Sequence, residues 1–79
     1  MSAYTWHEVF SKAYKKFCRQ VDRQQETVID PYAAESPGEF FAVLSEAFFE
    51  LPLAVQEHFP AVYEQLALFY RQDPAQRWR

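Results

Sequence analysis

Five prolines constrain the fold of this chain more than any other feature, because a proline inside a helix removes a backbone donor and clashes with the preceding turn. Pro37, Pro52 and Pro60 suit the first turn of a helix, where the missing N–H has no partner to lose. Asp30-Pro31 favours an extended or turn geometry, and Asp73-Pro74 ends the last apolar segment. The prolines therefore predict helices that begin near residues 37, 52 and 60.

Apolar spacing fills in these segments. Steps of three and four place one apolar stripe on a first helix: Trp6, Val9, Phe10, Ala13, Tyr14, Phe17 and Val21. Thr5 and Glu8 fit a capping box at its start, and the helix is expected to fade near Glu26. Ser36 and Glu39 fit a second capping box, which opens a central helix ending at Leu51. Helices near 52–58 and 60–71 follow, and no segment alternates as a strand does.

The sequence thus predicts an all-α, small bundle-like segment of about four helices, with residues 1–79 as one unit and a frayed tail over 75–79. The aromatic content of 19% is high for 79 residues. A core this small encloses only some of these rings, so the rest are expected to cover a ligand, a partner or a missing part of the same protein, or to sit half-exposed.

Charge and cysteine content exclude several classes of protein. The net charge of −3 argues against nucleic-acid binding through the overall field. No apolar run approaches the roughly 18 residues that a membrane span needs. Cys18 is the single cysteine, so no internal disulfide forms and a reducing cytoplasm is expected.

No complete catalytic motif is present. His7-Glu8 opens like a zinc-binding HExxH, but Ser11 stands where the second histidine belongs. His58 suits the C-terminal end of a helix, where a cation is favoured. From the residues alone, Glu39 is best explained by its capping box. One face of the first helix is basic and could meet an acidic surface or a phosphate backbone, or simply be solvated: Lys12, Lys15, Lys16, Arg19 and Arg23.

The central string IDPYAAESPGEFFAVLSEAFF, residues 29–49, resembles the C-terminal part of the MtfA (Mlc titration factor A) zinc peptidases. That family reads D-P-Y-A-A, then P-A-E-F-F-A-V-x-S-E-x-F-F. The likeness continues through residues 59–63 and 69–74, and residues 6–17 fit the segment that precedes it. Gly38 is the visible departure, where the family often has alanine.

The resemblance implies a role for two residues. Glu39 corresponds to a third zinc ligand that projects from a helix towards an upstream HExxH. Tyr32 matches a tyrosine that the related catalytic domain of anthrax lethal factor places beside the scissile carbonyl, so its phenol could stabilise the oxyanion. Phe40, Phe41 and Phe48 would then pack against the zinc-binding helix.

The resemblance also implies a larger α/β metallopeptidase domain, with zinc in the complete enzyme and peptides as substrates. An HExxH is absent from these 79 residues, so the chain alone is expected to bind no zinc and to be inactive. Its partners would be the missing N-terminal zinc-binding portion and an Mlc-type repressor.

Two alternatives stay open. The chain could be a non-catalytic helical interaction module that binds a repressor or associates with itself. A metal site between chains, with Glu39 of one and His58 of another, is the third hypothesis.

Overall fold

The computed structural model describes residues 2–78, and the side chains of residues 2–76. It contains four α-helices: α1 (Ala3–Asp22), α2 (Pro37–Glu50), α3 (Pro52–His58) and α4 (Pro60–Tyr70). Two 3-10 helices, η1 (Pro31–Ala34) and η2 (Pro74–Trp78), complete the described chain, which has no strands. The prediction of an all-α fold with about four helices is confirmed.

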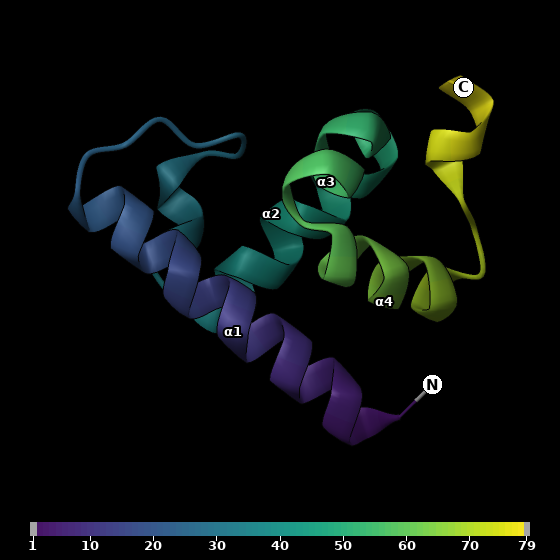
Figure 1. Cartoon of the computed structure of the whole chain (residues 1–79), viewed down its shortest axis with the longest axis horizontal. Helices are drawn as coiled ribbons and strands as arrows, with labels where there is room; N and C mark the ends of the chain where they lie inside the picture. The colour runs from purple at the N-terminus through teal and green to yellow at the C-terminus, as the bar shows by residue number, and fades with distance from the viewer. Residues whose placement is uncertain (1, 79) are drawn as a thin grey trace.

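The long helix α1 runs along one side of the molecule, and α2, α3 and α4 gather on the other side (Figure 1). α2 contacts η1, α3 and α4, whereas α4 packs on both α1 and α3. The link between α1 and α2 folds back at the far end of α1, so η1 packs against both helices. None of the described helices is long and apolar enough to cross a membrane.

Prolines open three of the four helices, as predicted. Pro37, Pro52 and Pro60 each occupy the first turn of their helix. Ser36 caps α2, since its Oγ accepts a hydrogen bond from the N–H of Glu39 at 3.2 Å. Local geometry therefore decides these boundaries.

Both predicted ends of α1 were wrong. Ser2 is the cap, and its Oγ accepts the N–H of Thr5 at 3.3 Å, so Thr5 lies inside the first turn. The other end falls at Asp22, because Gln24 adopts a left-handed φ of 57°. The N–H of Gln24 donates to Val21 and that of Gln25 to Gln20, which together form a Schellman motif.

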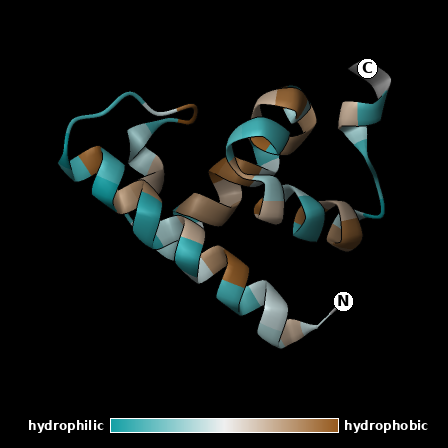
Figure 2. Ribbon diagram, in the orientation of Figure 1, coloured by the Kyte–Doolittle hydropathy of each residue, from teal (hydrophilic) through white to brown (hydrophobic). Residues whose placement is uncertain are grey.

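Phenylalanine rings from several elements meet in the core. Phe40 of α2 lies with its ring centroid 5.5 Å from that of Phe17 on α1, and 6.1 Å from that of Phe59 at the α3–α4 junction. Phe40 and Phe48 are 1% and 0% exposed. The expectation that Phe40 and Phe48 pack against a zinc-binding helix outside the chain was wrong, because the four helices enclose them, whereas Phe41 is only half-buried. Figure 2 shows the amphipathic pattern along α1, where hydrophobic and hydrophilic residues alternate around the helix.

Other large apolar side chains remain at the surface. Between 43% and 75% of each is exposed: Tyr4, Tyr32, Phe49, Leu51, Leu53, Leu68 and Phe69. Several lie near the α2–α3 junction and the end of α4. The aromatic side chains that lack cover are therefore Tyr4, Tyr32, Phe49 and Phe69, rather than Phe40 and Phe48.

The start of the C-terminal tail is anchored, where the sequence predicted fraying over 75–79. The hydroxyl of Tyr63 donates to the carboxylate of Asp73 and accepts the N–H of Ala75 at 3.0 Å. Ala75 is fully buried, and residues Pro74–Trp78 form η2. Two polar contacts and one buried methyl group therefore hold a segment whose composition suggested mobility; Arg79 lies outside the described residues.

Candidate functional site

η1 holds Tyr32 in a tightly hydrogen-bonded turn. The carboxylate of Asp30 accepts the N–H of Tyr32 at 2.9 Å, and the Asp30 carbonyl accepts the N–H of Ala33 at 2.9 Å. The Tyr32 carbonyl in turn accepts the N–H of Glu35 at 3.0 Å. An aspartate that bonds two residues ahead is the usual way to fix such a turn. The backbone of Tyr32 is therefore fixed, while its side chain is 56% exposed.

Glu39 is the third residue of α2 and lies half-buried in its first turn. The cap uses only the main-chain N–H of Glu39, which donates to Ser36. The Ser36 half of the predicted capping box is therefore confirmed, whereas the described residues show no hydrogen bond from the Ser36 N–H to the Glu39 carboxylate, which stays available. A carboxylate is also favoured here by the positive end of the helix dipole. Since η1 packs against α2, Tyr32 and Glu39 belong to adjoining elements.

A tyrosine on α1 holds this region from the other side. The hydroxyl of Tyr14 donates to the carbonyl of Ala34, the last residue of η1, at 2.7 Å. The thiol of Cys18, one turn further along α1, reaches the same carbonyl at 3.9 Å. The Tyr14 ring also packs on Phe40, with 5.4 Å between centroids. α1 thus fixes the segment between Tyr32 and Glu39.

Burial raises the pKa of the Tyr14 phenol above its ordinary value, with a smaller contribution from the thiol of Cys18. Tyr14 therefore stays protonated and able to donate at neutral pH. From its spacing, Tyr14 was predicted only as a member of an apolar stripe, and the role of its hydroxyl was missed. A hydrogen bond from the Tyr14 hydroxyl could have been predicted from the sequence, because a half-buried tyrosine normally finds a partner for its hydroxyl.

The remaining candidates show no metal site. His7 and Ser11 contact each other across one turn of α1, with 3.5 Å between Nε2 and Oγ. That is the spacing of an HExxH pair, with serine in the place of the second histidine. Within the described residues, no group of three or more His, Cys, Asp or Glu side chains could hold a metal ion. Glu39 supplies one oxygen of a type that zinc accepts, so a zinc ion bound there needs further ligands.

Sequence comparison matches the chain to known proteins over most of its length. The family described as glucose-regulated metallo-peptidase M90 matches residues 1–71. A protein named Mlc titration factor A from Edwardsiella ictaluri is 45% identical over 74 residues, which are 91% of this chain and 28% of that protein. The protein of the same name from Salmonella paratyphi B is 42% identical over 76 residues, 94% of this chain and 29% of its own length.

The chain spans less than a third of the length of these relatives. No solved structure is significantly similar to it. The match confirms the resemblance noted from residues 29–49 and from the flanking segments 6–17, 59–63 and 69–74. The chain therefore belongs to the glucose-regulated metallo-peptidase M90 family.

Proposed function

We propose that this chain is the part of an M90 metallopeptidase that supplies Glu39 as the third zinc ligand. The observation that carries the proposal is the geometry of the α2 start. The Ser36 cap binds the Glu39 backbone, which fixes the residue on a rigid helix and leaves its carboxylate free. Ligands held on helices are positioned more precisely than ligands on loops.

The other zinc ligands and the general base would come from an HExxH segment outside these 79 residues, within a larger α/β domain. Bound zinc would activate a water molecule for attack on a peptide bond. Tyr32 would donate its phenol hydrogen to the oxyanion that develops on the scissile carbonyl. Its exposed side chain, on a turn fixed by Asp30, suits a group that must meet a substrate. Without the HExxH, the chain alone is proposed to be inactive.

A chimera tests both roles. Residues 1–79 replace the matching segment of the Edwardsiella ictaluri relative, and zinc content and peptidase activity are measured. Glu39→Gln should lower zinc affinity at least tenfold and abolish activity, whereas Glu46→Gln, on the exposed part of the same helix, should change neither. Tyr32→Phe should keep zinc and lower kcat by roughly 10²-fold or more, the usual cost of one lost oxyanion donor.

Tyr4→Phe is the matched control for Tyr32, because Tyr4 is 75% exposed on α1. An unchanged zinc affinity in the Glu39→Gln chimera would refute the ligand assignment. Equal activity losses in both tyrosine variants would refute the assignment of Tyr32.

A second candidate function is favoured by the exposed apolar side chains of α2, α3 and α4. Phe49, Leu53 and Phe69 are each more than 40% exposed, which suits a surface that another protein covers. Under this proposal the chain is a non-catalytic module that binds a repressor or itself. Because the relatives are named Mlc titration factor A, Mlc is the repressor to test. Sedimentation of the isolated chain, with and without Mlc, tests this candidate. A chain that stays monomeric and does not bind Mlc would contradict it.

We also propose a cytoplasmic location for the metallopeptidase to which this chain belongs, because Cys18 has no disulfide partner in the chain.

A further inference from the structure

The basic residues of α1 form a stripe that the zinc chemistry does not use. At about 100° per residue, three of them and the C-cap residue Arg23 fall within an arc of about 60°: Lys12, Lys16, Arg19 and Arg23. This basic stripe is exposed and lies away from Phe17, which faces the core. Lys12 pairs with Glu8 at 3.1 Å, and the other three have no ion pair within the described residues. In a chain of net charge −3, the stripe is a local concentration of positive charge.

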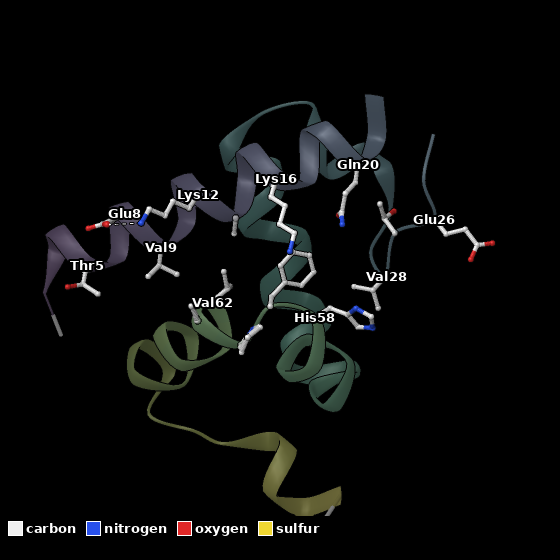
Figure 3. A pocket seen from close by; sticks show the side chains of 15 residues that line it. Thr5, Glu8, Val9, Lys12, Lys16, Gln20, Glu26, Val28, His58 and Val62 are labelled. Carbon is white, nitrogen blue, oxygen red and sulfur yellow. Dashed lines mark ion pairs between the residues drawn. The ribbon is translucent and has the colours of Figure 1, made fainter. Parts of the chain in front are cut away.

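A groove of about 610 Å³ runs beside the stripe, between α1, the link after it and the α3–α4 junction. The apolar part of the lining of this α1 groove includes Val9, Ala13, Val28, Phe59 and Val62, and polar side chains such as Thr27 and His58 complete it. Figure 3 shows the side chains of Lys16 and Gln20 directed from α1 into the groove. The carboxylate of Glu26 points away from it, and that of Glu8 is held at Lys12.

The two acidic groups nearest the groove therefore leave its α1 wall positive. The pairing with Lys12 also holds the pKa of Glu8 below its ordinary value. Lys16 is left as the cation that a ligand in the groove would meet. A carboxylate is the group that forms the strong, charge-assisted hydrogen bonds with such a cation.

The dimensions suit an extended peptide. The groove volume lies within the roughly 300–1,000 Å³ that ligand sites have, and its apolar lining suits an aliphatic or aromatic side chain. The stripe from Lys12 to Arg23 rises about 16 Å along α1. An extended peptide covers that length with about five residues. Carboxylates spread over five residues could therefore reach the whole stripe.

We propose that the α1 groove and the basic stripe bind an acidic peptide segment of another protein, with one apolar side chain in the groove and flanking carboxylates on Lys16 and Arg19. The proposal goes beyond the metallopeptidase assignment and does not depend on Glu39 or zinc. The charge complementarity of the wall favours a protein partner over nucleic acid, because the basic stripe holds only four cations on a chain that is acidic overall.

A random 12-residue peptide display library, selected on the immobilised chain, tests the proposal. The enriched peptides should combine two or more acidic residues with a neighbouring large apolar residue. A synthetic copy of the most enriched peptide is then titrated by fluorescence anisotropy. Lys16→Glu should weaken its binding at least tenfold, and added salt should weaken binding to the unmodified chain.

Lys15→Glu is the matched control, because Lys15 is the next residue on α1 but lines a different hollow with His7 and Ser11. It should leave affinity within twofold. Ala61→Phe, at the exposed start of α4 in the groove lining, should also weaken binding by filling the space. Circular dichroism checks that each variant keeps its helices.

Three outcomes would overturn the proposal. The library could enrich no peptide or peptides without acidic residues, Lys15→Glu could weaken binding as much as Lys16→Glu, or a single-stranded 12-nucleotide DNA could compete more strongly than the acidic peptide. The zinc content of the chimera is a separate readout, so failure here leaves the role of Glu39 unaffected.

Discussion

Tyr14 joins α1 to η1 through a single hydroxyl group. Its hydrogen bond to the Ala34 carbonyl lies between the two proposed site residues, Tyr32 and Glu39, along the chain. Tyr14→Phe keeps the ring that packs on Phe40 and removes only this bond. Since a hydrogen bond contributes about 0.5–1.5 kcal/mol net, and this one is partly buried, we expect a loss of stability within that range.

Urea unfolding measures this loss, and amide hydrogen exchange locates it. Exchange should accelerate most in Pro31–Ala34 and least at the buried core of α2. Tyr4→Phe serves as control, because Tyr4 is largely exposed. If the amides of η1 exchange as slowly in Tyr14→Phe as in the unmodified chain, the Tyr14 hydrogen bond does not hold this segment.

The same hydroxyl predicts a dependence on alkaline pH. Burial raises the pKa of Tyr14 in the folded chain above its ordinary value of 10.0. A group whose pKa is higher in the folded state than in the unfolded state adds stability to the folded chain. This stability is fully present at pH values below the unfolded pKa, and it is lost as the pH rises through the folded pKa. The stability difference between the unmodified chain and Tyr14→Phe should therefore be constant below about pH 9 and shrink from there to about pH 11. A difference that stays constant to the upper end would contradict this linkage.

The start of α2 offers a prediction about a whole helix. Ser36→Ala removes the oxygen that accepts the N–H of Glu39 and should cost about 1 kcal/mol. Ser45→Ala is the matched control on the same helix, because the buried Ser45 hydroxyl has no hydrogen-bond partner in the described structure. Removing an unpaired hydroxyl should be neutral or stabilising. Thermal unfolding measures the stability of both variants. An equal loss of stability in Ser45→Ala and Ser36→Ala would show that the Ser36 hydroxyl does not stabilise α2 as a cap.

The end of α4 gives a prediction of the opposite sign. Arg71 terminates the helix in a left-handed conformation with φ of 56°, which favours glycine. Arg71→Gly should raise the unfolding free energy by about 0.5–1 kcal/mol, because it relieves this strain. The exposed side chain of Arg71 has no hydrogen bond or ion pair in the described region that the change would remove. Urea midpoints compare it with Arg71→Ala, which should not stabilise the chain.

These elements also show what could be predicted from sequence. The predicted starts of α2, α3 and α4 were correct, because Pro37, Pro52 and Pro60 restrict their own backbone. The ends of α1 were not, since two hydroxyl residues could cap it and Gln24 carries no glycine-like signal for a left-handed turn. The cap at Glu39 was predictable from local spacing, whereas the Tyr14 anchor required contact between residues twenty positions apart. Tertiary packing decides such contacts, and local pattern does not record it.

At the scale of the whole molecule, the chain encloses a core that does not depend on a neighbour. Phe17, Phe40, Phe48 and Leu44 are each at most 1% exposed, and they come from α1 and α2. α4 closes this core with Val62 and Leu66, which are equally buried. A core shared with an absent segment would leave such side chains at a surface. We therefore expect the 79 residues to unfold in a single cooperative thermal transition.

Phe17→Ala tests whether this core is the source of stability. Phe17 is fully buried on α1, and its ring packs against those of Phe40 and Phe59. Its truncation should lower the free energy of unfolding by about 3–5 kcal/mol. That loss approaches the whole stability of a small domain, about 5 kcal/mol at the low end, so the variant should be largely unfolded at room temperature. Phe49→Ala removes the same ring from a site that is 44% exposed, and should cost far less. Circular dichroism on heating distinguishes the two, and equal transitions in both variants would show that the helices gain their stability elsewhere.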